Sequence, residues 1–269
     1  MPNLTLCSLA SGSTGNCTLL ASDTTRILID AGISARRIEQ ALSGLGLSAA
    51  DLQGICVTHE HSDHIQALPL LQRKYGMPLF ANAGTVQSMA QKPKFAGMQW
   101  HIFSNGQPFT VGDFVIEPYS IPHDAYDPVG YIVQWHHIRI GFATDIGLPT
   151  HLIKQRLKGC HALLLETNHD HELLQEADRP WSLKQRIAGR QGHLSNQQAA
   201  DLLVEVAGPE LQCVYLAHLS AECNHPHLAL STLKRTLQHA GRGDIDLQMT
   251  FPNAPSACWS LQLDAVPAS

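Results

Sequence analysis

The sequence predicts a layered α/β fold in which two packed β-sheets are covered by helices. Many short apolar runs of strand length follow one another in the first half of the chain, and helical patterns occur at intervals among them. Hydrophobic residues make up 44% of the 269 residues, which is enough for an extensive core. Because no long linker, repeat or low-complexity segment divides the chain, we expect a single domain over residues 1–269.

The first 46 residues are expected to contain three strands and one helix. Residues 11–16 are rich in Gly and Ser, so they predict a turn-rich connection between the first two strands. A helix is predicted at residues 34–45 because Ile38 and Leu42 recur at helical spacing, and Gly46 provides a stop signal. The three strands are expected in the apolar runs at residues 4–9, 17–21 and 26–29.

The rest of the chain continues the alternation of strands and helices. An apolar strand at residues 54–57 leads directly into a His-rich segment, and a helix follows at about residues 65–75. The runs at residues 162–165 and 213–217 are apolar throughout, which is typical of buried strands. Helical patterns occupy residues 196–206 and 227–238, and further strands are expected at 79–81, 100–103, 114–119, 131–135 and 138–143.

The charge balance excludes a protein coated in basic side chains for indiscriminate nucleic-acid binding. Lys and Arg number 18 against 23 Asp and Glu, which gives a formal net charge of −5 and leaves room only for a local basic patch. The chain has 16 His, almost as many as Lys and Arg together. Neutral imidazole is the commonest metal ligand, so the position of these His residues becomes the central question.

The seven Cys residues predict reduced thiols and not a disulfide framework, because their number is odd and no pair has CxxC spacing. The N-terminus lacks the basic region and long apolar stretch of a signal peptide. No run approaches the roughly 18 apolar residues of a membrane span. We therefore expect a cytoplasmic protein without membrane association.

Four potential metal ligands lie within six residues directly after a predicted strand. Imidazole nitrogen and carboxylate oxygen together suit borderline and hard divalent ions. On a loop leaving a strand, His59 and His61 can point to one place while Asp63 and His64 reach a neighbouring one, an arrangement that serves two ions. The alternative is a solvated loop that happens to be His-rich, but this pattern is far more restrictive than a lone His pair.

His-x-His-x-Asp-His after a strand resembles the signature of the metallo-β-lactamase-fold hydrolases. The resemblance implies a four-layer αββα sandwich of two mixed β-sheets flanked by helices. It also implies three further ligands after later strands, and His123, Asp145 and His218 each end an apolar, strand-like run. In the implied scheme one metal takes His59, His61 and His123, the other takes Asp63, His64 and His218, and Asp145 bridges them.

Five further motifs resemble the YycJ/WalJ branch of these hydrolases, and the similarity covers nearly the whole chain. The branch is associated with DNA exonuclease activity and is related to RNase Z and to PhnP-type phosphodiesterases. The chain departs from the branch at residues 222–227, which usually read Asn-Asn-x-Pro-Glu. Here His225 and His227 add imidazoles near His218, and we favour incidental surface residues over auxiliary ligands. The matching motifs cover residues 11–17, 165–170, 181–187, 192–196 and 217–220.

His193 and Glu166 match a proton-donating pair. His193 corresponds to the histidine of the RNase Z His-Ser-Thr loop, which protonates the leaving alkoxide, and Glu166 corresponds to the glutamate that orients it. A poor alkoxide leaving group needs an acid with a pKa near neutrality, and a carboxylate fixes the tautomer of that acid. Alternatively, His193 merely stands at the entrance of a helix capped by Ser195. We favour the catalytic role.

The segment from residue 179 to residue 190 is the best candidate for contacting a phosphate backbone, because it has no acidic residue in an otherwise acidic chain. A solvated helix face is an equally good interpretation. The Gly-rich loop at residues 11–16 lacks the Gly-Lys-Ser/Thr ending of a P-loop, which argues against ATP binding. The basic residues of the segment are Arg179, Lys184, Arg186 and Arg190, and Trp181 accompanies them.

The sequence as a whole predicts a phosphodiesterase that depends on two divalent metal ions and acts on nucleic acid, with DNA favoured and an exonuclease expected. A metal-bridging hydroxide would attack phosphorus, with Asp63 and Glu166 also in the catalytic set, and His193 would protonate the leaving oxygen. Five His ligands favour zinc, and the two carboxylates also suit manganese or iron. Two rivals remain: a thioester or lactone hydrolase on the same scaffold, and a metal-binding regulatory module without turnover. Digestion polarity and oligomeric state stay open.

Overall fold

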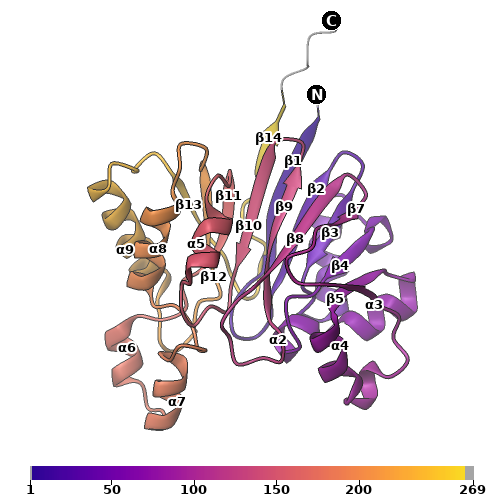
Figure 1. The fold of residues 1–269 in the computed structure, drawn as a ribbon, viewed down its shortest axis with the longest axis horizontal. Coiled ribbons are helices and arrows are strands. Elements are labelled where there is room, and N and C mark those ends of the chain that lie inside the picture. Colours follow the sequence, from indigo (N-terminus) through magenta and orange to yellow (C-terminus); the bar gives the residue numbers. More distant parts are fainter. Residues whose placement is uncertain (1, 264–269) are drawn as a thin grey trace, which may run out of the picture.

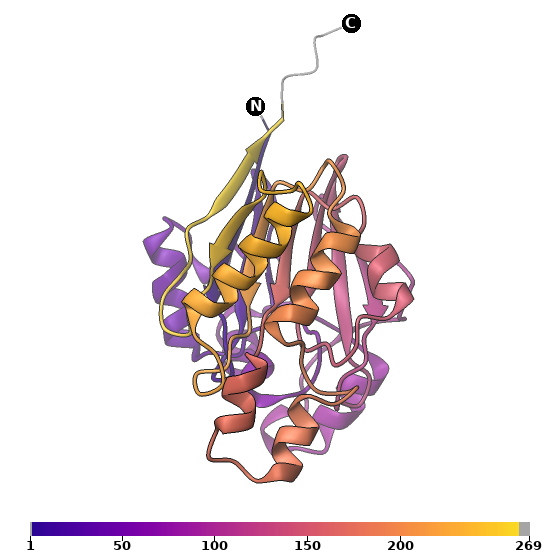
Figure 2. The same cartoon turned by 90° about the vertical axis from the view of Figure 1, so that its left-hand side faces the viewer.

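A computed structural model describes residues 2–263. In this part of the chain two seven-stranded sheets pack face to face, and helices cover the outer face of each sheet (Figure 1). The predicted four-layer sandwich is therefore confirmed. Figure 2 shows the helices α8 (Asn196–Val206) and α9 (Pro226–His239) lying side by side over the second sheet.

The first sheet is antiparallel on one side and parallel on the other. Its strands are β1 (Asn3–Ala10), β2 (Cys17–Ser22), β3 (Arg26–Ile29), β4 (Gly54–Cys56), β5 (Leu79–Asn82), β6 (His101–Phe103) and β14 (Trp259–Gln262). In the order β14-β1-β2-β3-β4-β5-β6, the pairs up to β3 are antiparallel and those beyond it are parallel. The last strand pairs with the first in the register Asn3↔Gln262 to Leu6↔Trp259.

The second sheet repeats this mixed pattern with the later strands. They are β7 (Phe109–Val111), β8 (Phe114–Ser120), β9 (Val129–Trp135), β10 (Ile138–Ala143), β11 (Ala162–Glu166), β12 (Cys213–Ala217) and β13 (Asp246–Met249). The meander from β7 to β10 is antiparallel, and β10, β11, β12 and β13 run parallel. Parallel neighbours need crossover connections, which explains why the helices lie on the outer faces.

The core consists of three hydrophobic clusters, one for each interface between layers. Between the sheets, Leu4 and Leu6 pack with the aromatic rings of Phe114, Tyr131 and Phe142. The side chains of the alternate β1 positions, such as Cys7 and Leu9, join the cluster under the first layer of helices. This alternation is the two-residue period of a strand buried on both faces. A third cluster joins the second sheet to α8 and α9.

The helices begin at capping residues that the sequence supplies. Ser34 accepts a hydrogen bond from the backbone N–H of Arg37 and caps α1, and Ser195 forms a capping box with Gln198 at the start of α8. The helices are α1 (Ala35–Gly44), α2 (Ser62–Ile65), α3 (Leu68–Tyr75), α4 (Ala83–Ala90), α5 (His151–Leu157), α6 (His171–Glu176), α7 (Trp181–Ile187), α8 and α9, with 3₁₀ turns at Ala49–Asp51 and Pro93–Phe95.

The helix predicted at about residues 65–75 is present, but it begins three residues later than expected, because a separate short helix precedes it. The short helix, α2, ends at Ile65, and α3 begins at Leu68 with Pro69 in its first turn. Proline lacks a backbone N–H and has a fixed φ, so it favours the first turn of a helix and interrupts one that is already running.

None of the described helices is long and apolar enough to cross a membrane.

Polar residues gather at one edge of the sandwich, because several parallel strands of both sheets end there. Asp30 follows β3, His59 follows β4, Asp145 follows β10, Glu166 ends β11 and His218 follows β12. The carboxyl ends of parallel strands meet at the same edge, where an α/β fold places its ligands. In Figure 1 this edge lies below the sheets, between α2 and α7.

Candidate metal centre

The structure brings all seven predicted metal ligands together. Their ligand atoms form overlapping groups within 4.8 Å of one another, drawn from loops that follow strands of both sheets. One group consists of His59, His61 and His123, a second of Asp63, His64 and His218, and a third of His59, His64 and Asp145. A fourth group joins Asp145 and His218 to Glu166 and His193.

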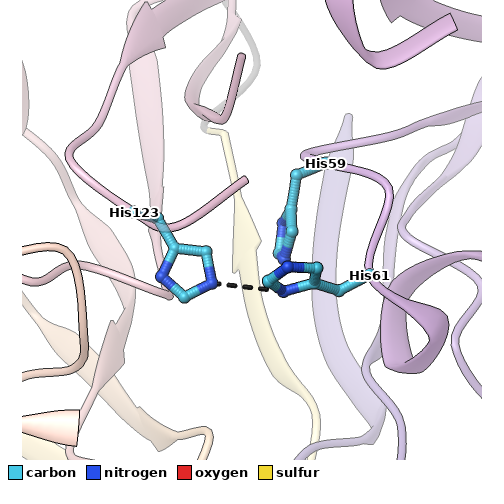
Figure 3. Close-up of side chains that lie close together, drawn as sticks. All are labelled: His59, His61 and His123. Carbon is cyan, nitrogen blue, oxygen red and sulfur yellow. Dashed lines mark hydrogen bonds between the residues drawn. The ribbon is translucent and has the colours of Figure 1, made fainter. Parts of the chain in front are cut away.

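The first group consists of three imidazoles from the two halves of the sandwich. Figure 3 shows His123, from the loop after β8, facing His61 and His59 from the loop after β4. Nε2 of His123 lies 3.3 Å from Nδ1 of His61, so these two ring nitrogens can share either a proton or a cation. The other nitrogen of the His123 ring, Nδ1, lies 3.2 Å from the Gly192 carbonyl oxygen, which holds Nε2 toward the site.

The second group is held in place by a buried carboxylate behind it. Nε2 of His64 and Nε2 of His218 each lie 3.4 Å from Oδ2 of Asp63. Nδ1 of His64 is 2.7 Å from Oδ2 of Asp30, which also accepts a hydrogen bond from the Thr58 hydroxyl. A carboxylate that binds the far nitrogen of a metal-ligating His fixes its tautomer and its orientation. Asp30 is therefore a positioning residue.

Asp145 lies between the two groups. Its Oδ2 is 3.4 Å from Nε2 of His64, and its Oδ1 is 3.5 Å from Nε2 of His218 and 3.7 Å from Nε2 of His123. Both Asp145 and His218 have positive φ, at 59° and 57°. Non-glycine residues seldom adopt this conformation, and those that do cluster at active and ligand-binding sites.

The electrostatics of the cluster favour bound positive charge. Burial alone would raise the pKa of Asp63, but His64 and His218 lower it far below its usual range. Burial would likewise lower the pKa of His218, but the carboxylates of Asp145, Asp63 and Glu166 raise it to about 10. Burial and the neighbouring imidazoles lower the pKa of His59 well below its usual value. The carboxylates therefore stay ionised and attract protons or metal cations.

These residues fit a metal centre. Nε2 of His59 and Oδ2 of Asp145 are buried and have no hydrogen-bond partner, although a buried polar atom without a partner is costly. Both residues belong to the same group of converging ligand residues, together with His64. A divalent cation between them would compensate the desolvation of both atoms.

Comparison with known proteins shows the family of the chain. The β-lactamase superfamily domain matches residues 25–218. The chain belongs to the metallo-β-lactamase fold family. Exodeoxyribonuclease YycJ of Bacillus anthracis is 37% identical over 92% of this chain and 96% of its own length. Exodeoxyribonuclease WalJ of Streptococcus pneumoniae is 38% identical over 87% of this chain and 88% of its own. The metallo-β-lactamase fold protein YhfI of Bacillus subtilis, only 14% identical, superposes with a TM-score of 0.72 and covers 97% of this chain and 100% of its own.

Next to the proposed metal ligands, Glu166 links His193, its partner in the predicted proton-donating pair, to the backbone. Nδ1 of His193 lies 2.7 Å from Oε1 of Glu166. The fully buried carboxylate also accepts hydrogen bonds from the backbone N–H groups of Ile146 and Leu194, and Nδ1 of His218 lies 3.1 Å from it. Burial would lower the pKa of His193, but Glu166 raises it above its usual value. The structure thus orients His193 and links it to a proposed metal ligand.

The predicted basic segment adjoins the metallo-β-lactamase centre, but most of its charges already have partners. Arg179 pairs with Glu222 at 2.7 Å, Arg186 pairs with Asp124, and Nζ of Lys184 donates to the Gln175 carbonyl oxygen. Arg190 forms no ion pair among the described residues. Arg179, Arg186 and His193 line one pocket of about 180 Å³.

The two extra imidazoles lie apart from the proposed metal ligands. His225 and His227 are exposed, and Nδ1 of His225 accepts a hydrogen bond from the backbone N–H of His227 at the start of α9. Neither belongs to a group of converging ligand atoms. Their placement agrees with the favoured interpretation as surface residues.

Sequence reasoning missed the residues that support this metallo-β-lactamase centre from behind. Asp30 orients His64, and the Ser11 hydroxyl accepts a hydrogen bond from the backbone N–H of His218. Gly32 lies so close to the ligand loop that an added Cβ would be 1.6 Å from the Asp63 carbonyl oxygen. The one available signal was position, because Asp30 and Gly32 directly follow a predicted strand.

Proposed function

We propose that this chain is a phosphodiesterase that depends on two divalent metal ions and acts as a DNA exonuclease. The observation that carries the proposal is the convergence of two ligand groups on Asp145, with the His193–Glu166 pair beside them. Two relatives that match most of the chain are named exodeoxyribonucleases, which supports a metal-dependent phosphodiester hydrolase. Digestion of DNA from an end is the finer part of the proposal.

The two ions would be held by the seven residues that the structure brings together. His59, His61 and His123 would hold one, Asp63, His64 and His218 the other, and Asp145 would contact both. Five imidazoles and two carboxylates favour zinc, and they also suit manganese or iron. When bound, such ions supply hydroxide near neutral pH and offset the negative charge that develops on phosphate.

His193 would deliver the proton that the leaving oxygen needs. Because Nδ1 is bound by Glu166, the proton available to a substrate is the one on Nε2. The imidazole is one-fifth exposed and lines the pocket next to the ligands, so it can reach a bound ester. Transfer of the proton to the departing alkoxide leaves a neutral imidazole, which Glu166 holds in the orientation that accepts a proton from solvent.

The basic segment would bind the phosphates of the strand. Arg186 on α7 and Arg179, which lies just before this helix, both line the pocket. Each now pairs with a carboxylate, so phosphate would replace Asp124 or Glu222 as its partner. Arginine is suited to this exchange because its fork of N–H donors matches both carboxylate and phosphate oxygens.

Metal analysis and a substrate panel test the proposal together. Protein loaded with zinc, manganese or iron is incubated with end-labelled single- and double-stranded DNA, RNA, a cyclic phosphodiester and a thioester. We expect hydrolysis of DNA from an end, with two metal ions per chain. Hydrolysis of the thioester alone would identify an acyl hydrolase, and no turnover of any substrate by metal-replete protein would identify a regulatory module.

A further inference from the structure

The exposed aromatic side chains among the described residues lie on segments that adjoin the proposed metal centre. Among the described Phe, Tyr and Trp residues, only Trp181, Tyr126 and Phe251 are exposed, by 61%, 58% and 44% of their surface. All the others are buried or half-buried. Single exposed apolar residues are common on protein surfaces, so what is informative is that these three lie on segments that adjoin the same centre.

Tyr126 lies on the loop that also carries the ligand His123. Its backbone N–H donates a hydrogen bond of 2.8 Å to Oε1 of Glu60, which stands between the ligands His59 and His61. The phenol hydroxyl reaches only Oε1 of Gln87 in α4, at 3.4 Å. The ring is therefore fixed at its base, beside the first group of ligands, while most of its surface faces solvent.

Phe251 lies on the loop that follows β13, at the same edge of the sandwich. Its carbonyl oxygen accepts a hydrogen bond of 2.9 Å from the backbone N–H of Ser11. The hydroxyl of Ser11 in turn accepts from the backbone N–H of the ligand His218, at 2.8 Å. Phe251 is thus two hydrogen bonds from the second group of ligands.

Trp181 is the first residue of α7, the short helix that extends below the centre (Figure 1). Leu183 and Arg186 of this helix line the same pocket as His193. No side chain of α7 is buried, so the helix presents its residues to solvent or to a ligand. Trp181 lies two residues after Arg179, which also lines this pocket, so this segment carries an aromatic ring and a positive charge close together in the chain.

We propose that Trp181 and Tyr126 bind the unpaired bases at the end of a nucleic-acid strand, a role that rests on the proposed function. Aromatic side chains stack on bases of any sequence, and the arginines of the neighbouring segment complement the phosphates between them. In a duplex the faces of the bases are covered by their neighbours, whereas single strands and frayed ends expose them. The chemical class of ligand is therefore a strand end with free base faces.

The test measures binding and does not depend on turnover. Metal-loaded protein is titrated into a dye-labelled single-stranded DNA with phosphorothioate linkages, which resist cleavage, and anisotropy gives Kd. The same strand is tested as a blunt duplex, as RNA, and with abasic residues at its end. The variants are Trp181→Ala, Tyr126→Ala and the conservative Trp181→Phe. Val204→Ala, a solvent-exposed position in α8 about two turns beyond the cap, is the control.

We expect each Ala variant to weaken binding of the single strand by about 5- to 20-fold, which is the lower range for base–aromatic stacking. The same variants should change binding of the blunt duplex and of the abasic strand less than about 2-fold, because neither offers unpaired base faces at its end. Trp181→Phe should retain most of the affinity, Val204→Ala should leave it unchanged, and RNA should behave like DNA.

The outcomes separate this proposal from the proposed function. Hydrolysis of bis(p-nitrophenyl) phosphate, which has no base, measures the phosphodiesterase alone. If the wild type hydrolyses it but the Ala variants bind single strands as tightly as the wild type, stacking is wrong and the proposed function stands. If the Ala variants change only the oligomeric state of the protein, the rings cover a protein interface and the stacking proposal is overturned. If no phosphodiester is hydrolysed, the proposed function itself fails.

Discussion

Replacing His193 with Ala separates proton delivery from metal binding. His193 is outside the seven proposed ligands, so the variant should keep both metal ions. Hydrolysis of DNA should nevertheless slow by about 10²–10⁴-fold, the usual contribution of a positioned general acid. Hydrolysis of bis(p-nitrophenyl) phosphate should change little, because p-nitrophenolate leaves without a proton.

The structure also indicates what this substitution costs in stability. The lost contact is the 2.7 Å interaction with Oε1 of Glu166, whose carboxylate keeps its contacts with His218, Ile146 and Leu194. A hydrogen bond to a charged group contributes about 1.5–3 kcal/mol, and the partial exposure of the imidazole places this one at the lower end. The variant should therefore fold, with a melting temperature lowered by only a few degrees.

The assay compares kcat for the oligonucleotide and for the chromogenic ester at saturating metal, together with metal content by mass spectrometry. His225→Ala is the matched control, since this His is exposed and lies outside the ligand groups. If His193→Ala loses a metal ion, or slows both substrates equally, the proton-donor role is refuted and His193 belongs to the metal or to the structural shell.

Three further predictions follow from the same contacts. Glu166→Gln should slow DNA hydrolysis in the same direction as His193→Ala but by less, because it weakens the orientation of the acid without deleting it; an equal or larger loss with depleted metal would contradict this. Replacing the four basic residues of the 179–190 segment with Gln should weaken DNA binding and flatten its salt dependence, while the rate of bis(p-nitrophenyl) phosphate hydrolysis stays the same. An unchanged slope of log Kd against log salt would show that the segment is a solvated face. Gly32→Ala should destabilise the fold by about 3 kcal/mol, because its Cβ would overlap the Asp63 carbonyl oxygen at 1.6 Å, and an unchanged melting temperature would show that the ligand loop moves freely.

The strands that could be predicted are those with an apolar run of their own. Residues 26–29 and 213–217 form β3 and β12 as expected, because both strands are buried on the two faces. By contrast, β13 and β14 have no fully buried residue. They exist because a neighbouring strand offers free backbone groups, and pairing of that kind leaves no local pattern in the sequence.

The sequence did not predict α7, and the reason is again a missing local pattern. No residue of α7 is buried, so its sequence lacks the apolar stripe that reveals an amphipathic helix. The boundary between α2 and α3 depends on Pro69, which the hydrophobic period ignores. Helices with a broad buried face, such as α8, were predicted to the residue.

The convergence of the seven proposed metal ligands could be predicted, because four of them form a dense motif and the others end apolar runs. Asp30 could not, since a lone Asp after a strand has no distinguishing spacing, and its role appears only when β3 and β4 lie side by side. The ion pairs of Arg179 and Arg186 could not be predicted from the sequence either, because Glu222 and Asp124 lie more than 40 residues away along the chain.

The metal content of wild type and Asp145→Ala, measured on the same preparations as hydrolysis of bis(p-nitrophenyl) phosphate, tests the central claim most directly. We expect two ions per chain in the wild type. In the variant we expect fewer ions and no activity, because Asp145 lies between both ligand groups and alanine offers no replacement oxygen. Two ions retained in Asp145→Ala, or an active wild type that holds none, would contradict the central claim.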